Sequence, residues 1–279
     1  MNPKQLLDDA VASLEAGGVE SARNDAEILL SHVLGIPRVL VALTGRPQPE
    51  QLAVFRKMID ARAARTPLQH LTGRAGFRYV DLEVGPGVFV PRPETELLAG
   101  WAVDAARVAG PTPVVVDLCT GSGAIALSIV QEVPGAVVHA VELDEGAYAW
   151  AQRNLAGTGV DLRLGDALEA FTDLDGTVDV VVSNPPYIPL EAWESVAPEV
   201  RDHDPALALW SGDDGLDAIR GIEQVAWRLL KPGGVVGLEH ADAQGESAPA
   251  VFSRSEHPWR DVRDHVDLAG RPRFVTARR

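Results

Sequence analysis

The chain has 279 residues, a length that suits one large domain or two modest ones. Hydrophobic residues make up 46% of it and charged residues 23%, a balance that excludes disordered, collagen-like and low-complexity proteins. Its 40 acidic and 25 basic residues give a net charge of −15, which disfavours binding to nucleic acid or to an anionic membrane. The single cysteine, Cys119, cannot form a disulfide within the chain, and neither a signal-peptide pattern nor a membrane-length apolar run is present. We therefore expect a cytoplasmic protein.

The sequence pattern of the first 73 residues predicts a series of helices. Apolar residues recur at helical spacing from Leu6 to Leu14 and again from Ile28 to Leu34, and a glycine follows each stretch. We expect four helices: the first can be capped by Asn2, the second begins at Ser21, and the others span Val39–Leu43 and Pro49–Arg65. Since this stretch contains no constellation of titratable side chains, its pattern indicates a module for packing or docking.

Beyond the helices the pattern changes to that of an α/β protein. Residues 76–90 alternate around glycines and favour a β-hairpin, which Pro91-Arg-Pro-Glu-Thr-Glu96 connects to a helix over Leu97–Val108, with Glu94 or Thr95 as its cap. From Pro113 strands and helices alternate, which predicts a doubly wound, mainly parallel sheet of seven strands. The expected strands are Val114–Leu118, Val137–Glu142, Leu162–Leu164, Val178–Ser183, Val235–Glu239, Val262–Leu268 and Arg273–Ala277, and the expected helices are Ala124–Val133, Ala147–Ala156, Leu216–Leu230 and Ser247–Arg254.

A glycine-containing loop follows the first strand of this sheet. It reads Asp117-Leu-Cys-Thr-Gly-Ser-Gly123 and leads directly into a helix, so its backbone can approach a ligand closely. Because Asp117 would repel a phosphate and attract a cation, the loop favours a ligand with an amino group and a positive centre, such as S-adenosylmethionine. Glu142, at the end of the next strand, could accept two hydrogen bonds from ribose hydroxyls, and Asp166 after the third strand could meet an adenine amino group.

The string Asn184-Pro-Pro-Tyr187 after the fourth strand is the most informative in the chain. Its tandem prolines stiffen the backbone and remove two N–H donors. The Asn184 side-chain oxygen and the Pro185 carbonyl can accept both hydrogens of a planar –NH2 group, and Tyr187 can stack on its plane. Fixed acceptors favour the positive charge that develops on such a nitrogen as it attacks a sulfonium methyl. The string therefore predicts methyl transfer to an amide or aromatic amine without a general base.

The glycine loop and the Asn184-Pro-Pro-Tyr187 string resemble motifs of the protein-glutamine N5-methyltransferases of peptide-chain release factors, the PrmC/HemK family. Three further strings share this resemblance: Arg65-Thr-Pro-Leu-Gln-His-Leu-Thr-Gly73, Pro91-Arg-Pro-Glu-Thr-Glu96 and Gly237-Leu-Glu-His-Ala-Asp-Ala-Gln244. The resemblance covers almost the whole chain. It implies a class I, Rossmann-like methyltransferase that uses S-adenosylmethionine and modifies the glutamine of a Gly-Gly-Gln loop. It also implies a helical substrate-recognition domain over residues 1–73, a β-hairpin connector over 74–98 and a methyltransferase domain over 99–279.

The resemblance further implies two sets of site residues. The cofactor site would comprise Asp117, Cys119, Thr120, Gly121, Ser122, Gly123, Glu142, Asp166, Ala167 and Asn184. The glutamine would be bound by Asn184, Pro185, Pro186 and Tyr187, with Asn184, Pro185 and Tyr187 as the catalytic residues. Cys119 and Ala241 stand where the family usually has glycine, and Ala167 where some relatives have a large aromatic residue. These departures bear on cofactor affinity.

Two other classes of function stay open. A turn like Asn184-Pro-Pro-Tyr187 also binds the base amino group in adenine-N6 and guanine-N2 nucleic-acid methyltransferases. The negative net charge of the chain counts against this function. A protein that binds S-adenosylmethionine without turnover would not need the turn. The histidines show no metal-ligand spacing and Ser122 lacks a nucleophile elbow, so we expect neither a metal site nor nucleophilic catalysis. Arg92 and Glu94 could orient the substrate or pin their loop, and Pro189–Asp214 is either a surface loop or also a cover for the glutamine pocket.

Overall fold

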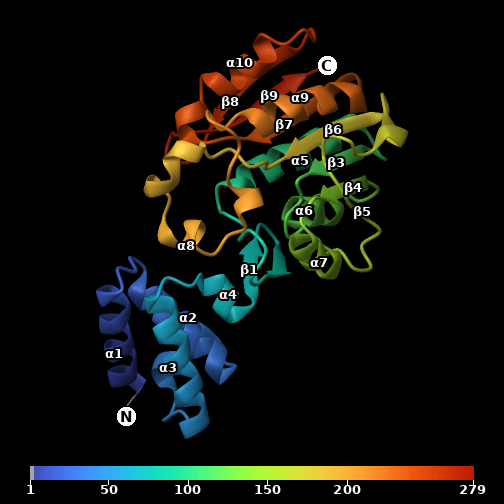
Figure 1. Cartoon of the computed structure of the whole chain (residues 1–279). Helices are drawn as coiled ribbons and strands as arrows, with labels where there is room; N and C mark the ends of the chain where they lie inside the picture. Colours follow the sequence, from blue (N-terminus) through green and yellow to red (C-terminus); the bar gives the residue numbers. More distant parts are fainter. Residues whose placement is uncertain (1–2) are drawn as a thin grey trace. The chain divides into compact units, whose positions relative to one another are not determined.

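The computed structural model describes residues 3–279, which form two compact units (Figure 1). One unit contains the chain up to Arg74 together with the segment Ala197–His203, and the other contains Ala75–Val196 and Asp204–Arg279. The chain therefore leaves the larger unit after Val196 and returns to it at Asp204. The three-part division at residues 73 and 98 stays a prediction.

Helices α1, α2 and α3, blue in Figure 1, pack against one another in the smaller unit. Its core comes from the predicted apolar stripes, and Leu14, Leu29 and Leu30 are fully buried there. The elements of this unit are α1 (Pro3–Ala16), α2 (Ala22–Leu34), the 3-10 helix η1 (Arg38–Leu43), α3 (Pro49–Ala63), α4 (Leu68–Thr72) and α8 (Pro198–Arg201).

The four helices expected in this region are present, with differences at their ends. Helix α3 stops before the predicted end at Arg65, which adopts a left-handed φ of 70°. Ser21 takes the N-cap position of α2, but its hydroxyl donates to the Asp25 carboxylate at 2.9 Å instead of capping the helix. The proposed cap Asn2 lies outside the described residues. Helix α4 was not predicted, because a helix of five residues is too short to display a periodic pattern.

Ion pairs explain why Ala197–His203 belongs to the helical unit. Glu199 Oε1 lies 3.1 Å from Arg62 Nη1, and Glu199 Oε2 lies 2.6 Å from Arg65 Nη2. The Arg62 guanidinium is buried and also pairs with the buried Asp25 carboxylate, at 2.8 Å. Removing one partner of such a buried network leaves an uncompensated charge, which costs about 3–5 kcal/mol. Glu199 therefore fastens its segment to α3 and the residues that follow it.

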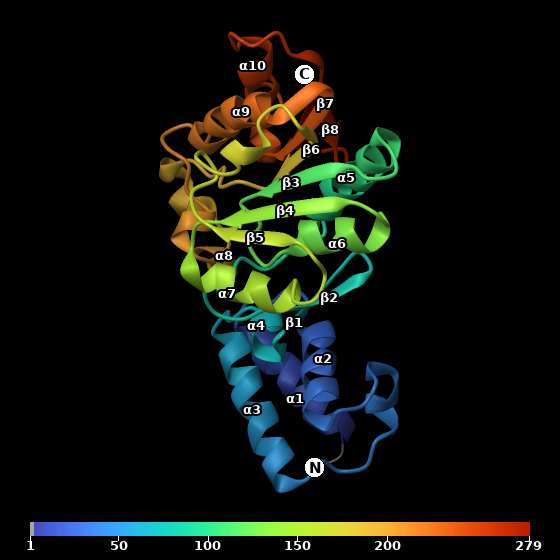
Figure 2. The ribbon, with the colours of Figure 1, turned by 90° about the vertical axis from the view of Figure 1, so that its right-hand side faces the viewer.

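The larger unit is built on a seven-stranded sheet with the strand order β5-β4-β3-β6-β7-β9-β8, and the first five of these follow one another in Figure 2. Those five strands pair in parallel, whereas β9 runs antiparallel to β7 and β8. The strands are β3 (Val114–Leu118), β4 (Val137–Glu142), β5 (Asp161–Leu164), β6 (Val178–Ser183), β7 (Leu230–Glu239), β8 (Arg260–Val266) and β9 (Pro272–Arg278). The predicted doubly wound, mainly parallel sheet of seven strands is confirmed.

Helices cover both faces of this sheet. On one face α5 (Thr95–Ala109), α6 (Ala124–Glu132) and α7 (Glu145–Asn154) enclose one apolar core, and on the other α9 (Asp217–Leu229) and α10 (Ser247–Ser253) enclose a second. Strand β6 is buried along its whole length, which agrees with the apolar run Val180–Val182 at its centre. Within residues 3–279, no helix has the length and apolar composition that a membrane crossing requires.

Three parts of the larger unit differ from expectation. The predicted hairpin is shorter, with β1 (Arg74–Phe77) and β2 (Val80–Glu83). Strand β7 begins before the predicted Val235, because Leu230 already pairs with Val178 across a bulge. The insertion after β6 contains the short helices η3 (Leu190–Ser195) and η4 (Ala206–Ala208) besides α8, and the remaining 3-10 turns are η2 (Thr172–Leu174) and η5 (Asp242–Gln244).

Candidate functional site

The candidate site lies at the carboxyl edge of the parallel strands. Strand register aligns Leu118 of β3 with Ser183 of β6, and Ser183 with Leu238 of β7. The residues that follow these strands therefore emerge side by side, namely the glycine loop, Asn184 and the end of β7 at Glu239. In open α/β sheets this edge is where ligands bind.

Left-handed backbone shapes the loop between β3 and α6. Cys119, Gly121 and Gly123 have φ values of 60°, 58° and 84°. A cysteine in this region is strained because its Cβ crowds the backbone, so a glycine would suit the position better. At Gly121 an added Cβ would meet no described heavy atom within 4 Å, so the space beside this residue is open. A ligand can approach the backbone there.

Asp117 is fully buried at the end of β3 and offers an unused acceptor. Its Oδ2 accepts hydrogen bonds from Thr120 Oγ1 at 2.6 Å and from the Ala126 N–H at 3.1 Å. Its Oδ1 is buried and receives no hydrogen bond from any group in residues 3–279. Burial raises the pKa of Asp117 to about 7, against the hydrogen bonds, which lower it. A buried acceptor of this kind fits a cationic donor such as an ammonium group.

Glu142 is held by the backbone at the end of β4. Its Oε1 accepts from the Leu143 and Asp144 N–H groups, both at 2.9 Å, and its Oε2 accepts from the Gly121 N–H at 2.8 Å. Burial raises the pKa of this carboxyl, and the backbone hydrogen bonds oppose that rise. A carboxylate has about four acceptor positions, so one stays open on Oε2. The site as it stands therefore has room for one of the two predicted ribose hydrogen bonds.

Asp166 and Ala167 follow β5 with different exposures. Asp166 is exposed, and its Oδ1 accepts from the Leu168 N–H at 2.9 Å, as in an ordinary polar turn. Ala167 is buried against the second core and offers only a methyl surface. Ala241, the third departure from the family pattern, has a φ of −67°, which an alanine adopts without strain.

A stiff turn, Asn184-Pro-Pro-Tyr187, follows β6. Three of its polar groups each form a hydrogen bond with a different side chain. The Asn184 Nδ2 donates to the Thr95 Oγ1 at 3.2 Å. The Tyr187 hydroxyl donates to Glu239 Oε1 at 3.1 Å, and the Tyr187 carbonyl accepts from Gln244 Nε2 at the same distance. Burial and the Glu239 carboxylate raise the pKa of Tyr187 well above 10, so its hydroxyl stays protonated. Pro185 is buried and Pro186 half-buried.

Three side chains that support this turn were not predicted to be part of the site. Thr95 is buried and serves the site, whereas the sequence indicated it only as a possible cap for α5. Glu239 is buried at the end of β7, where burial raises its pKa to about 7. Gln244 reaches Tyr187 from the motif after β7. The sequence did hold one signal for Glu239: it is an acidic residue at the end of an apolar strand, β7, and the strand paired with β7 is followed by Asn184.

Arg92 forms an ion pair with Asp204, a residue of the insertion Pro189–Asp214. Arg92 Nη2 lies 2.7 Å from Asp204 Oδ2, and its guanidinium stacks on the Phe89 ring. Burial raises the pKa of Asp204 to about 6, against the attraction of Arg92, which lowers it. These contacts indicate that Arg92 pins its loop. Glu94 takes the N-cap position of α5, but its side chain makes no cap bond to any backbone N–H described here.

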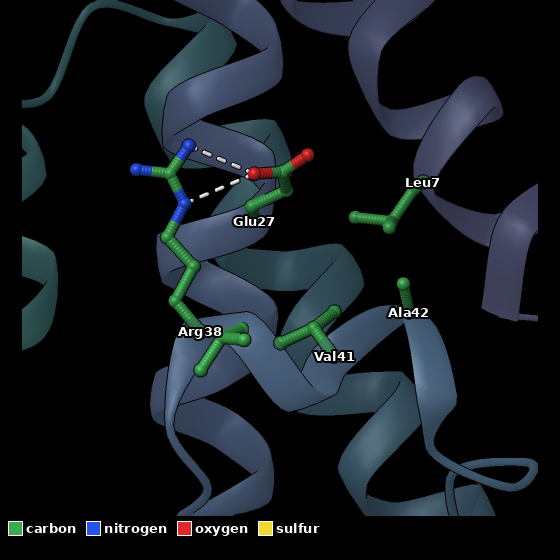
Figure 3. Close-up of a pocket in the computed structure, with 6 residues that line it drawn as sticks. Leu7, Glu27, Arg38, Val41 and Ala42 are labelled. Atoms are coloured by element: carbon green, nitrogen blue, oxygen red, sulfur yellow. Dashed lines mark hydrogen bonds and ion pairs between the residues drawn. The ribbon is translucent and has the colours of Figure 1, made fainter.

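The helical unit has a pocket of its own, of about 580 Å³ (Figure 3). It is lined by Leu7, Glu27, Arg38, Val39, Val41 and Ala42. Arg38 Nη2 pairs with Glu27 Oε2 at 2.8 Å on one wall, and Leu7, Val41 and Ala42 point into the opposite part of the pocket. Val39, which lines this pocket, and Leu43, which follows the lining residue Ala42 in the chain, are 78% and 82% exposed.

Comparisons with known proteins identify the class of enzyme first. Residues 101–197 match the family model described as methyltransferase small domain, and residues 5–73 match the PrmC N-terminal domain. With the doubly wound sheet and the carboxyl-edge site, these matches define a methyltransferase.

The relatives then identify the family. The chain is 59% identical to a release factor glutamine methyltransferase of Streptomyces coelicolor, over 97% of this chain and 95% of that protein. It is 43% identical to a 4-amino-L-phenylalanine/4-methylamino-L-phenylalanine methyltransferase of Streptomyces pristinaespiralis, over 91% and 88% of the two chains. A solved release-factor-specific protein-(glutamine-N5) methyltransferase of Alicyclobacillus acidocaldarius is 29% identical with a TM-score of 0.45, covering 71% of this chain and 98% of that one. This chain belongs to the release factor glutamine methyltransferase family. The nucleic-acid alternative is not favoured.

Proposed function

We propose that the protein transfers a methyl group from S-adenosylmethionine to the side-chain amide nitrogen of the glutamine in the Gly-Gly-Gln loop of a peptide-chain release factor. The observation that carries this proposal is the turn after β6. There the Asn184 Nδ2 is engaged by Thr95, which leaves the Asn184 Oδ1 and the Pro185 carbonyl as acceptors for the two hydrogens of a substrate –NH2 group. The lone Cys119 thiol and a translation factor as substrate both support a cytoplasmic location.

The residues at the edge of the sheet fit the proposed cofactor. The buried Asp117 Oδ1 would receive its ammonium group, the open acceptor position on Glu142 would receive a ribose hydroxyl, and the open space at Gly121 would admit it to the loop. In the proposed assignment the cofactor site also includes the remaining loop residues Cys119, Thr120, Ser122 and Gly123. Asp166 and Ala167, which follow β5, complete this site. When bound, S-adenosylmethionine supplies a methyl group on a positively charged sulfur.

The chain's own groups provide orientation and charge stabilisation. An amide nitrogen is a poor nucleophile because its lone pair is delocalised. As it is alkylated, positive charge develops on the nitrogen, and the acceptors at Asn184 and Pro185 interact with this charge more strongly than with the neutral amide. The Tyr187 ring can lie against the amide plane, since its hydroxyl is fixed by Glu239. The proton leaves after transfer, so no general base is required.

We also propose that the helical unit recognises the body of the protein substrate. It offers a pocket that Val39 lines and that Leu43 follows in the chain, both of them exposed, and contiguous exposed apolar patches mark surfaces that other proteins cover. The ion pairs of Glu199 hold Ala197–His203, a part of the insertion that follows the Asn184 turn, within this unit.

The proposed function is tested by incubating a release factor with enzyme and cofactor and searching the Gly-Gly-Gln peptide for one added methyl group by mass spectrometry. Asn184→Ala should lower the single-turnover rate by about 10²–10³, as removal of one preorganised polar partner does. Asn184→Asp keeps an acceptor and should retain more activity than the alanine variant. A folded Asn184→Ala protein with the wild-type rate would show that the turn is structural.

The same assay separates this substrate from an aromatic amine, on which one relative acts according to its name. Both substrates present a planar –NH2 group to Asn184 and Pro185. Methylation of free 4-aminophenylalanine without methylation of the release factor would reject the proposed substrate while keeping the reaction type.

A further inference from the structure

Backbone hydrogen bonds join the two ends of the insertion that follows the Asn184 turn. The Ile188 N–H donates to the Leu209 carbonyl at 2.8 Å, and the Ile188 carbonyl accepts from the Ser211 N–H at 3.0 Å. A further bond runs from the Leu190 N–H to the Gly212 carbonyl at 3.1 Å. We call these residues the neck of the insertion. Since the neck begins directly after the turn, a displacement of one is passed on to the other.

The side chain of Gln244 connects the turn, the end of the insertion and the segment after β7. Gln244 is buried, at 5% exposure. Its Nε2 donates to the Tyr187 carbonyl at 3.1 Å and to the Asp214 carbonyl at 3.2 Å, and its Oε1 accepts from the Ala241 N–H at 2.9 Å. Both hydrogens of the amide are therefore used. A turned amide would place its oxygen against two carbonyl oxygens, so the side chain has one favourable orientation.

Gly215 packs against the same junction, which we define as the contact of Gln244 with Tyr187 and Asp214. The φ of Gly215 is 75°, in the left-handed region that favours glycine. A Cβ at this position would overlap the Tyr187 carbonyl oxygen, and it would lie 2.7 Å from Gln244 Nε2. The backbone of Gly215 thus fills the space beside the hydrogen bond between Gln244 and Tyr187, and the junction leaves no room for a side chain.

The junction determines where Tyr187 lies. Gln244 holds the Tyr187 carbonyl, and Glu239 holds the hydroxyl at the other end of the same residue, at 3.1 Å in each case. The rings of Pro185 and Pro186 fix φ in the backbone that precedes Tyr187. A shift of the Tyr187 backbone therefore moves the Pro185 carbonyl as well, and this carbonyl is one of the two acceptors assigned to the substrate.

We propose that Gln244 is a positioning residue for methyl transfer, which together with Gly215 anchors the Asn184 turn and the neck to the end of β7 as one body. This inference rests on the proposed function. Gln244 touches neither the substrate nor the cofactor in this assignment. It acts by keeping the Tyr187 ring and the acceptors of the turn in the place where they meet the substrate –NH2 group.

The test uses the full chain with a Gly-Gly-Gln release factor, and it measures kcat together with the Kd of S-adenosylmethionine. Gln244→Met keeps the length of the side chain and removes its hydrogen bonds, whereas Gly215→Ala disturbs the same junction by size alone. Thr276→Val is one control, because it removes a different buried hydrogen bond, between Thr276 and His265 at 2.8 Å. Gly176→Ala is the other, because Gly176 has a similar φ of 70° but a Cβ there would meet no described heavy atom within 4 Å.

Gln244→Met and Gly215→Ala should each lower kcat about tenfold or more, the effect expected when a productive position loses the hydrogen bonds that stabilise it. The Kd of S-adenosylmethionine should stay within about twofold of wild type, because Asp117 and Glu142 share no described hydrogen-bond partner with Gln244. Both controls should match wild type. A folded Gln244→Met enzyme with the wild-type kcat, or one whose cofactor affinity falls in parallel with kcat, overturns the inference. If Gln244→Met does not fold, the comparison of Gly215→Ala with Gly176→Ala decides by the same criteria.

A measurement without turnover keeps this result separate from the proposed function. The chain has 3 tyrosines, so NMR of protein with isotope-labelled tyrosine rings gives few signals, and Tyr187→Phe identifies the one from Tyr187. Gln244→Met should shift or broaden this signal and leave those of Tyr79 and Tyr148 in place. An unmoved Tyr187 signal overturns the inference even where the release factor is methylated. A moved signal, in a protein whose wild type fails to methylate the release factor, would leave the anchoring by Gln244 standing and reject the substrate.

Discussion

Asp117 leads to a sharp prediction about the pH dependence of cofactor binding. Its carboxyl is fully buried, and burial raises its pKa from an ordinary 3.8 to about 7. That difference corresponds to roughly 4 kcal/mol against ionisation. At pH 6.5 about three quarters of the free protein would then hold this carboxyl protonated, and above pH 8.5 almost none.

A cation placed at the open Oδ1 favours the ionised form, so binding should drive the proton out. We expect uptake of S-adenosylmethionine to release about half to three quarters of a proton at pH 6.5 and almost none at pH 8.5. The sign follows from this linkage: because the free protein holds the proton more tightly than the complex, affinity rises with pH between 6 and 8 and then levels off.

Isothermal titration calorimetry in buffers of different ionisation enthalpy measures this proton directly. Asp117→Asn should abolish the release between pH 6 and 8. Asp179→Asn serves as the control, since Asp179 is a buried carboxyl at the other end of β6 and should leave the release unchanged. Equal binding heats in all buffers at pH 6.5 would refute the reasoning, because they would mean that no protonated carboxyl meets the cation.

Two further predictions concern the ribose contact and the helical unit. Glu142→Ala should weaken cofactor binding by about 1–3 kcal/mol, the cost of losing a charged hydrogen-bond acceptor, and unchanged affinity by calorimetry would dismiss the ribose assignment. The double change Val39→Ser and Leu43→Ser should raise the KM for whole release factor at an unchanged kcat. The control is Val108→Ser, because Val108 is a similarly exposed valine on α5, and this change should leave the KM unaltered. An unchanged KM in the double variant would contradict a docking role for the surface at Val39 and Leu43.

These point changes probe the helical unit better than removal of residues 1–73. The structure places Ala197–His203 in the same compact unit as the N-terminal helices, held there by the two ion pairs of Glu199. A truncated chain would leave Glu199 without Arg62 and Arg65, and its loss of activity would report on the insertion as much as on recognition. The sequence could not predict this, because an ion pair between distant segments has no periodic or local signature.

The predictable and unpredictable parts of the site differ in the range of the interactions that create them. The loop from Asp117 to Gly123 and the turn at Asn184 were identified because their chemistry is encoded in adjacent residues that follow predictable strands. Thr95 and Glu239 escaped because each acquires its role through tertiary contact, Thr95 by lying at the start of α5 and Glu239 by the pairing of β7 with β6. A strand end beside a predicted catalytic turn is therefore the place to search for supporting polar residues.

The charge around Cys119 decides what this unusual loop residue can do. Burial raises the pKa of its thiol to about 12, and the negative charges of Glu142, Asp117 and Asp166 add to that rise. A thiol reacts or binds metal as the thiolate, and here the thiolate is suppressed at every physiological pH. The same carboxyl groups that would attract a cationic cofactor therefore keep Cys119 inert, and its remaining influence is the strain of its left-handed backbone.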